Sequence, residues 1–437
     1  MTRVLDAEFR SNTIPGLVVL VIFCGVALPG LFRTALFTEN WDEVQYHLPA
    51  IKHFAVGLPH LDFSTYSSAT TPLYHVLFGL LLRMGCSLTT LRLINFAISI
   101  ATVIIVMSYL RRASSGGQSD WMAYSATLLF ATSMYVVGPS IRLTTDNLAL
   151  GCAFGVLYFL DRTETESGRN FAIAVVVSLI AILTRQLYLW LVPLLGVYAL
   201  TNPEWDTRRR ITAIFASAIP LISVVPLFLL WHGFANGQFA NKHQLHGSII
   251  NGRALVLAIC MVGAFATIFA TALVRVPLPD LRGKLLLFGT FVLAIGALPM
   301  LDASAGSYQV PMEGGWLRAL AQHSPEVFHV WSLFWILFPI GCVVIAAMSY
   351  RAAIAGRREL WFVLGIGLWL TLNIMQARSL AKYYEPFEVV AVGRFAVMAP
   401  AKIWDNVPVW MMIAVFVVFD IFRFWFGTPW ASPGFNS

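Results

Sequence analysis

The chain has 437 residues, of which 58% are hydrophobic and only 12% are charged, and its mean hydropathy is +0.74. A soluble domain carries about 25% charged residues, so a soluble globular protein is excluded. The formal net charge of +7 does not indicate a nucleic-acid partner, because the basic residues cluster in short segments between apolar runs. These segments are RRASSGGQ, DTRRR, RVPLPDLRGK and RAAIAGRR, and such clusters are typical of cytoplasmic loops of membrane proteins.

Apolar runs recur from one end of the chain to the other, each about as long as the roughly 20 residues that a membrane-spanning helix requires. We therefore expect an all-α, polytopic membrane bundle of about 11–13 spans. It would form a single membrane domain over residues 1–437. The five cysteines all lie in apolar segments without metal-ligand spacing, so they predict no disulfide framework.

The first span is expected over residues 14–37, followed by an outer loop over residues 38–71. The next apolar segment, 72–84, is short. The charge pattern allows only one crossing between the outer loop and Arg111-Arg112, so either this segment does not cross or one loop is assigned to the wrong side. Further spans are expected at 91–110, 121–137, 147–160, 171–200, 211–231, 254–274, 285–301, 331–349, 360–376, 388–401 and 408–426.

The run 171–200 is unusually long and is interrupted by Arg185-Gln186. It can form two short crossings with this pair at the tip. The outer loops hold all nine histidines, at their centres or edges, and many of the acidic residues. We therefore expect the chemistry of the protein to lie on the outer face.

The first outer loop contains NWDEVQYHLP, which has the signature of a helix start. Asn40 is a good N-cap, and Glu43 three residues later completes a capping box. Apolar residues on one side of this segment predict a short helix lying at the membrane surface.

The acidic pair Asp42-Glu43 has two interpretations. In the first, the two carboxylates only favour the positive end of the helix dipole. In the second, one of them is a general base that accepts the proton of a hydroxyl group. Asp42 is the first candidate for this base and Glu43 the second, because Glu43 also suits the capping box.

Further polar residues at the outer edges of the spans are candidates for substrate binding. Arginine forms forked hydrogen bonds with phosphate and lysine supplies a compact charge, so the cations predict a site for a lipid-linked phosphate. The candidates are His47, Arg142, Asp146, Arg185, Gln186, Lys242, His243, Lys382, Tyr383 and Glu385.

Each of these candidates also has a plainer interpretation. Arg185 can be a charge snorkelling from a short helix, and Gln186 can orient its neighbours. Arg142 and Asp146 can form an ion pair that fixes the edge of a helix. Lys242 and His243 can belong to a solvated loop.

A metal site is not expected, and neither is another cofactor. His243 and His246 are three residues apart in a glycine-containing loop, and neither H-x-x-x-H nor H-E-x-x-H occurs on a helix. A divalent metal is not needed to neutralise a leaving phosphate if arginine or lysine lies beside it.

The order of the motifs resembles the GT-C class of membrane glycosyltransferases, and within it the dolichyl-phosphate-glucose α-1,2-glucosyltransferase family. The resemblance is carried by WDEVQYHLPAIKHF, SATTPLYHVLFG, LRLINF, TRQLYLW, FANKHQLH and AKYYEPFEVV. It covers residues 40–250 well and the last third poorly. The segment FANKHQLH lacks the leading aspartate of the family's basic loop, and residues 302–330 have no counterpart.

The resemblance implies a GT-C-like bundle with a surface-lying first-loop helix. It implies a polyprenyl- or dolichyl-phosphate sugar as donor, and a hydroxyl of a glycan or lipid as acceptor on the non-cytoplasmic face. The first-loop carboxylate would act as base in a single inverting displacement. The membrane would be the plasma membrane of a prokaryote or the endoplasmic reticulum of a eukaryote, and the sugar and acceptor are not implied.

Two other classes remain open. A protein O-mannosyltransferase or a glycan ligase would act on similar lipid-linked substrates. A transporter or lipid flippase would instead show charges in the middle of its spans and internal repeats, and only the interruption at Arg185 points that way.

Overall fold

The structure, a computed structural model, describes residues 2–33, 42–114, 118–236, 251–276, 280–301, 315–355, 357–374, 384–400 and 402–425. Helices dominate these residues, which confirms the all-α class. The first half of the chain forms α1 (Thr2–Ala27), α2 (Leu48–Gly57), α3 (Leu73–Arg83), α4 (Leu88–Ala113), α5 (Gln118–Ala131), α6 (Met134–Ile141), α7 (Asp146–Asp161), α8 (Thr163–Thr184), α9 (Leu191–Thr201) and α10 (Thr207–Trp231).

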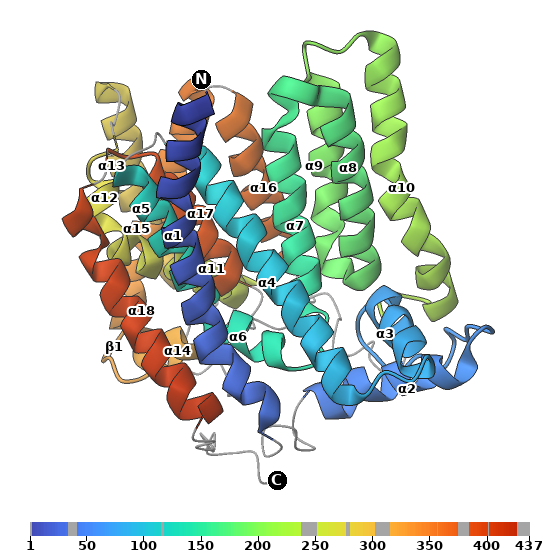
Figure 1. The fold of residues 1–437 in the computed structure, drawn as a ribbon. Helices are drawn as coiled ribbons and strands as arrows, with labels where there is room; N and C mark the ends of the chain where they lie inside the picture. The colour runs from blue at the N-terminus through green and yellow to red at the C-terminus, as the bar shows by residue number, and fades with distance from the viewer. Residues whose placement is uncertain are drawn as a thin grey trace.

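The second half forms α11 (Gly252–Ile268), α12 (Ala270–Leu273), α13 (Leu281–Ala297), α14 (Gly315–Ala321), α15 (Ser332–Ala355), α16 (Arg357–Ile374), α17 (Glu385–Val397) and α18 (Val407–Asp420). Two short antiparallel strands, β1 (Glu326–Val327) and β2 (Val330–Trp331), precede α15. Long helices run between two ends of the bundle, and α2, α3, α6, α14 and β1 gather at the lower end in Figure 1. The N-terminus lies at the upper end.

Six helical segments among the described residues are long and apolar enough to cross a membrane. They are Ile14–Phe32, Leu88–Ala113, Thr207–Trp231, Leu281–Met300, Ser332–Ile354 and Trp404–Trp425. Several shorter apolar helices pack among them, so the higher number of spans expected from the sequence stays a prediction. The protein is an integral, multi-pass membrane protein.

The short segment after the first outer loop does not cross the bundle. With 11 residues, α3 is about 17 Å long, well below the thickness of a bilayer core. It lies beside α2 at the lower end (Figure 1). A Cβ atom on Gly79 would lie 2.9 Å from the backbone oxygen of Ile51, so the two helices need a glycine here. Of the two interpretations of this segment, the non-crossing one holds.

The long apolar run from residue 171 to 200 is divided as expected. Helix α8 ends at Thr184, and Arg185 has an extended backbone with φ −157° and ψ 115°. A 3-10 turn, Gln186–Trp190, then leads into α9. The division places Arg185 and Gln186 at the lower end, as the sequence predicts for the tip of two short crossings.

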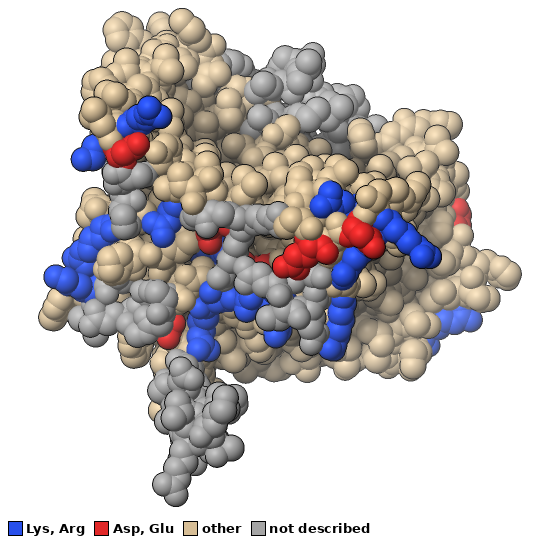
Figure 2. Space-filling model, turned by 90° about the horizontal axis from the view of Figure 1, so that it is seen from above, with Lys and Arg blue, Asp and Glu red and all other residues tan. Residues whose placement is uncertain are grey.

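The upper end of the bundle is basic. Figure 2 looks onto this end and shows Lys and Arg side chains spread across it, with Asp and Glu side chains among them. Exposed basic residues of the described chain in these connections are Arg162, Arg169, Arg208, Arg209, Arg282, Lys284 and Lys402. The clusters that the sequence assigns to the cytoplasm therefore lie together at one end.

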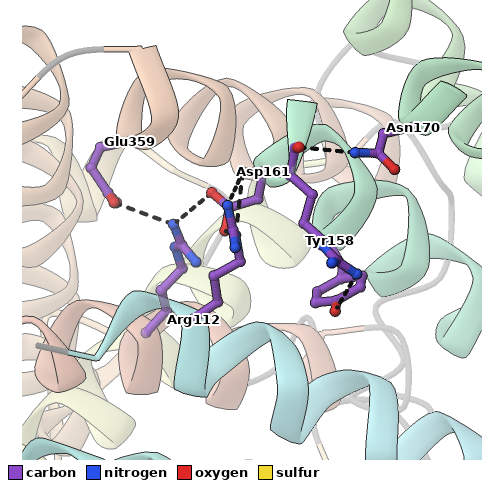
Figure 3. A network of polar contacts seen from close by, with 7 residues as sticks. Arg112, Tyr158, Asp161, Asn170 and Glu359 are labelled. Atoms are coloured by element: carbon purple, nitrogen blue, oxygen red, sulfur yellow. Dashed lines mark hydrogen bonds and ion pairs between the residues drawn. The ribbon is translucent and has the colours of Figure 1, made fainter. Parts of the chain in front are cut away.

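A buried charge network joins four helices near the upper end (Figure 3). Arg394 of α17 is fully buried, and its guanidinium lies 3.5 Å from Asp161 and 3.2 Å from Glu359. Arg112 reaches the same Asp161 at 3.2 Å. The ring of Tyr109 lies 4.6 Å from the Arg394 guanidinium carbon and covers its apolar face. The network therefore neutralises Arg394, the basic residue of α17 (Glu385–Val397).

Two glycines allow α11 and α15 to touch through their backbones. A Cβ atom on Gly263 would lie 2.0 Å from the carbonyl oxygen of Leu337, and one on Gly341 would lie 2.0 Å from that of Ile259. Small residues commonly permit such close approach between membrane helices, where packing rather than the hydrophobic effect drives association.

We predict that Gly263→Ala lowers the thermal unfolding midpoint of the purified protein in detergent. The added methyl group meets rigid backbone, so the expected cost is about 1–3 kcal/mol, as for an overpacked core. The matched control is Gly289→Ala in α13, where an added Cβ meets no atom within 4 Å. Equal midpoints for the two variants would show that the α11–α15 contact is looser than the structure describes.

Candidate active site

Glu43 fastens the first outer loop to the bundle. It lies in a π-helical turn, Glu43–His47, and is fully buried. Its Oε1 accepts a hydrogen bond from Nε of Arg92 at 3.0 Å, and its Oε2 accepts one from the backbone N–H of Leu143 at 2.9 Å. Both oxygens are thus engaged by α4 and by the connection between α6 and α7. Asn40, the expected N-cap, lies outside the described residues.

Asn95 complements this ion pair from the next turn of α4. Its amide nitrogen donates to the carbonyl oxygens of Pro139 at 2.8 Å and Arg142 at 2.7 Å. Its amide oxygen accepts from the hydroxyl of Tyr74 at 3.0 Å. The motif LRLINF therefore places two polar side chains, Arg92 and Asn95, on one helix face toward the same connection. Neither residue was among the candidates predicted from the sequence. Two polar residues three positions apart in an apolar span nevertheless indicate a shared contact on one helix face.

Asp42 differs from its neighbour in exposure. It occupies the N-cap position of the turn, where its side chain makes no capping hydrogen bond, and it is exposed. Its negative charge raises the pKa of Arg142, although less than the charge of Glu43 does. The acidic pair is therefore divided into a buried structural carboxylate and an exposed one.

Arg142 is a buried cation beside this exposed carboxylate, and 8% of its surface is exposed. Burial, followed by repulsion from Arg423, lowers the pKa of Arg142 to about 9, while Glu43 and Asp42 oppose the change. The two guanidinium carbons lie 5.7 and 5.6 Å from the ring centre of Phe424. Two cations therefore pack on one aromatic ring, and their mutual repulsion favours the binding of an anion near them.

Asp146 and Arg185 form an ion pair at the edge of a pocket. The sequence suggested Arg142 as a partner of Asp146, and the structure shows an ion pair of Asp146 with Arg185. The pocket is partly open to its surroundings, and its cavity volume is about 30 Å³, enough for one or two water molecules. It is lined by Tyr135, Asp146, Leu150, Arg185, Leu187, Tyr188, Trp369, Asn373, Pro386 and Phe387. The lining therefore combines aromatic walls with one ion pair.

Gln186 orients its neighbours, as one interpretation of the sequence proposed. Its amide nitrogen donates to the carbonyl oxygens of Ala69 at 2.7 Å and Phe234 at 3.0 Å. The hydroxyl of Thr71 donates to the carbonyl oxygen of Ile182 at 2.6 Å. These bonds tie the SATTPLY segment and the end of α10 to the tip between α8 and α9.

Glu385 begins α17 and is fully buried. Its carboxylate accepts hydrogen bonds from the hydroxyl of Ser133 and the indole N–H of Trp316. Its neighbour Pro386 lines the pocket beside Asp146 and Arg185. Glu385 therefore belongs to the wall behind the pocket, and it joins α17 to the start of α6 and to α14.

His47 lies in a buried aromatic and histidine cluster rather than on an open surface. Its Nδ1 lies 2.8 Å from Nε2 of His75, whose Nδ1 lies 2.6 Å from the hydroxyl of Tyr66. The ring of Trp231 stacks on Tyr66 at 5.8 Å. His47 was a candidate predicted from the sequence, whereas Tyr66 and His75 were not. Their spacing does not show that the loop folds back on α3.

The remaining candidates lie outside the described residues: Lys242, His243, Lys382 and Tyr383. In the part of the chain that the structure describes, no three His, Cys, Asp or Glu side chains gather as a metal-binding group. The described site therefore consists of the exposed Asp42, the cation Arg142 and the pocket beside Asp146 and Arg185.

We predict that replacing the two neighbouring acids has very unequal effects on stability. Glu43→Ala leaves Arg92 without its buried partner and is expected to lower the free energy of unfolding by about 3 kcal/mol or more. Asp42→Ala is expected to change it by about 0.5 kcal/mol at most, because it is exposed and makes no capping bond. Unfolding by SDS in mixed micelles measures both. Equal losses of stability in the two variants would contradict the interpretation that Glu43 is structural and Asp42 is not.

Comparison with known proteins places part of the chain in a functional class. Residues 70–231 match the family of dolichyl-phosphate-mannose-protein mannosyltransferases. Among solved structures, the chain is similar to the crystal structure of ArnT from Cupriavidus metallidurans in the apo state, with 15% sequence identity and a TM-score of 0.32 over 86% of this chain and 77% of that one. No curated protein sequence matches the chain. The family match supports a membrane glycosyltransferase and gives no support for the glucosyltransferase branch.

Proposed function

We propose that the protein transfers a sugar from a polyprenyl-phosphate-linked donor to a hydroxyl of a glycan or lipid acceptor, with Asp42 as the general base. The observation that carries this proposal is the division of the acidic pair. Glu43 is buried and accepts hydrogen bonds from Arg92 and Leu143, whereas Asp42 is exposed and its charge acts on Arg142. Of the two carboxylates, only Asp42 is exposed where an acceptor hydroxyl can reach it.

The proposed reaction is a single displacement. The acceptor oxygen forms a bond to the anomeric carbon of the sugar as the bond from that carbon to the phosphate oxygen breaks. The acceptor proton goes to the carboxylate of Asp42, and the lipid phosphate leaves with the bonding electrons. Because attack and departure occur on opposite faces, the anomeric configuration inverts.

The leaving phosphate gains negative charge during this step, and nearby cations stabilise it. The charge of Asp42 acts on Arg142, and Arg185 lines the pocket with Asp146. Preorganised positive charge in a partly buried site stabilises such a transition state without a metal ion. Each arginine also has acidic neighbours: Asp146 pairs with Arg185, and the charges of Glu43 and Asp42 act on Arg142.

The test must include more than one donor sugar and acceptor. The family that the chain matches is that of mannosyltransferases, which take dolichyl-phosphate mannose as donor and protein as acceptor. The matched residues 70–231 include Arg92, Arg142 and Arg185 but not Asp42. We therefore keep a protein O-mannosyltransferase-like activity as the second candidate. Radiolabelled glucosyl and mannosyl polyprenyl phosphates, each with membrane lipid, oligosaccharide and protein acceptor fractions, distinguish the two.

We predict that Asp42→Asn lowers the rate of sugar transfer by about 10²–10⁴-fold, the usual contribution of a positioned general base. The measurement is label transfer in membranes at matched expression. Asp62→Asn is the matched control, since Asp62 is an exposed acid of the same loop whose hydrogen bonds from Ser64 and Thr65 lower its pKa to about 2. It should transfer sugar like the wild type. Sugar transfer by the Asp42→Asn variant at the wild-type rate would refute the role of Asp42 as general base. A wild type that consumes no donor would favour a transporter.

We also predict that Arg142→Gln raises the KM for the lipid-linked donor by about 10- to 100-fold, as expected when a charge-assisted hydrogen bond to phosphate is lost. Arg142→Lys keeps the charge and should recover part of the loss. Arg208→Gln, an exposed arginine at the opposite end, serves as the control. Steady-state kinetics with varied donor measure the effect. Unchanged values of both KM and kcat would place the phosphate elsewhere.

A further inference from the structure

The hairpin that β1 forms with β2 places an exposed apolar side chain at the lower end of the bundle (Figure 1). Val327 pairs with Val330, so the turn between the strands consists of two residues, Phe328 and His329. The side chain of Phe328 is 78% exposed and that of Val327 is 41% exposed. The proposed transfer step gives this hairpin no role.

The turn has a backbone conformation that suits other residues better than Phe. Phe328 and His329 have φ angles of 51° and 63°, and both central residues of a type I′ turn require positive values. Asn and Gly adopt this conformation readily, whereas a bulky residue is an outlier there. Turn chemistry therefore does not explain a Phe at this position. Its exposure also leaves most of its apolar surface outside the packing of the protein.

The tip of the hairpin continues the outward side of α15. The ring of Phe328 lies 6.1 Å from the ring of Trp335. Trp335 lies in the first turn of the candidate span Ser332–Ile354, next to Ile336, which is 59% exposed. Phe334 is fully buried, so Trp335 and Ile336 mark the side of this turn that faces away from the bundle. In a membrane-spanning helix that side faces lipid.

The hairpin is also tied to α14 and, through it, to the wall behind the pocket. The hydroxyl of Ser324 donates to the carbonyl oxygen of Ala321, the last residue of α14, at 2.7 Å. It also accepts a hydrogen bond at 3.3 Å from the backbone N–H of Leu333 in α15. Trp316 of α14 donates its indole N–H to Glu385. A displaced hairpin would therefore displace the helix that carries this hydrogen bond.

We propose that the tip of the β1–β2 hairpin, Val327 and Phe328, inserts into the interfacial region of the lipid bilayer and anchors α14 there. A span of 23 residues that begins at Ser332 is about 35 Å long, slightly more than the roughly 30 Å of the hydrocarbon core. Its first residues therefore lie at the membrane boundary, and Phe328 precedes them by four residues. Aromatic and other apolar side chains leave water at this boundary without needing a cavity in the protein.

Insertion is tested by ¹⁹F NMR of the full-length protein in phosphatidylcholine bilayers, with trifluoromethyl-phenylalanine in place of Phe328. Dissolved oxygen concentrates in lipid and a nickel chelate stays in water, so the two relaxation agents report the surroundings of the label. Reference proteins carry the label in place of Ile336, on the outward side of α15, or in place of Arg208, an exposed residue at the basic end. We expect the ratio of oxygen to nickel effects at position 328 to be closer to that at 336 than to that at 208.

Two outcomes of this measurement would overturn the proposal. A ratio equal to that at position 208 would show that the tip lies in water. A label that responds to neither agent would show that another protein surface covers the tip. Neither outcome depends on sugar transfer, so the proposed function can fail while this result stands.

Anchoring is tested by the direction in which one substitution changes amide exchange. Phe328→Asn suits both the turn and water, so in a hairpin that faces water it would leave exchange unchanged or slow it. In an anchored hairpin the lost ring frees the hairpin and α14, and we expect exchange over residues 315–333 in bilayers to accelerate about tenfold. Phe328→Leu keeps an apolar side chain and should accelerate exchange by at most about threefold.

Hydrogen–deuterium exchange followed by mass spectrometry measures the wild type and both variants in the same bilayers. Unchanged or slower exchange in Phe328→Asn would overturn the anchoring role. An equal acceleration in Phe328→Leu and Phe328→Asn would also overturn it, because it would show that the Phe ring packs on the protein rather than in lipid. Exchange in α10, whose span lies away from the hairpin, should stay the same in all three proteins.

Discussion

The ion pair between Glu43 and Arg92 is the interaction on which the described site depends. It joins the first outer loop to α4, and the second oxygen of Glu43 holds the connection after α6 through the N–H of Leu143. Asp42 and His47 flank Glu43 in the chain, so neither can be placed unless this pair is formed. A buried ion pair adds little net stability compared with apolar packing. Its use here is to fix one geometry among several that an apolar loop could adopt.

Much of the fold follows from patterns that are local in the sequence. Apolar runs mark the spans, the basic loops mark one end, and Arg185-Gln186 marks the break between α8 and α9. These features succeed because the bilayer imposes hydrophobic length and charge placement on each segment separately. The short α3 was the ambiguous case. Its length alone argued against a crossing, but its place beside α2 needed the contact at Gly79.

The site itself was only partly predictable. The sequence predicted a site that combines acids and cations, from Asp42, Arg142, Asp146 and Arg185. It did not show which acid pairs with which cation, because this depends on the distances between segments in the folded chain. Asp146 pairs with Arg185, 39 residues away, and Gln186 reaches a carbonyl 117 residues away. Tyr66 and His75 are ordinary loop and helix residues by composition, and their link to His47 appears only in three dimensions.

The hydrogen bond between Ser133 and Glu385 sets an order of events during synthesis. These residues are 252 positions apart, so the wall behind the pocket stays incomplete until α17 has been made and inserted. At a translation rate of about 5–20 residues per second, this delay lasts on the order of tens of seconds. During that interval the ribosome-bound chain already carries Asp42 and Arg142. A nascent chain released before residue 385 would therefore hold the acid and the cation in the membrane with an unfinished cavity beside them.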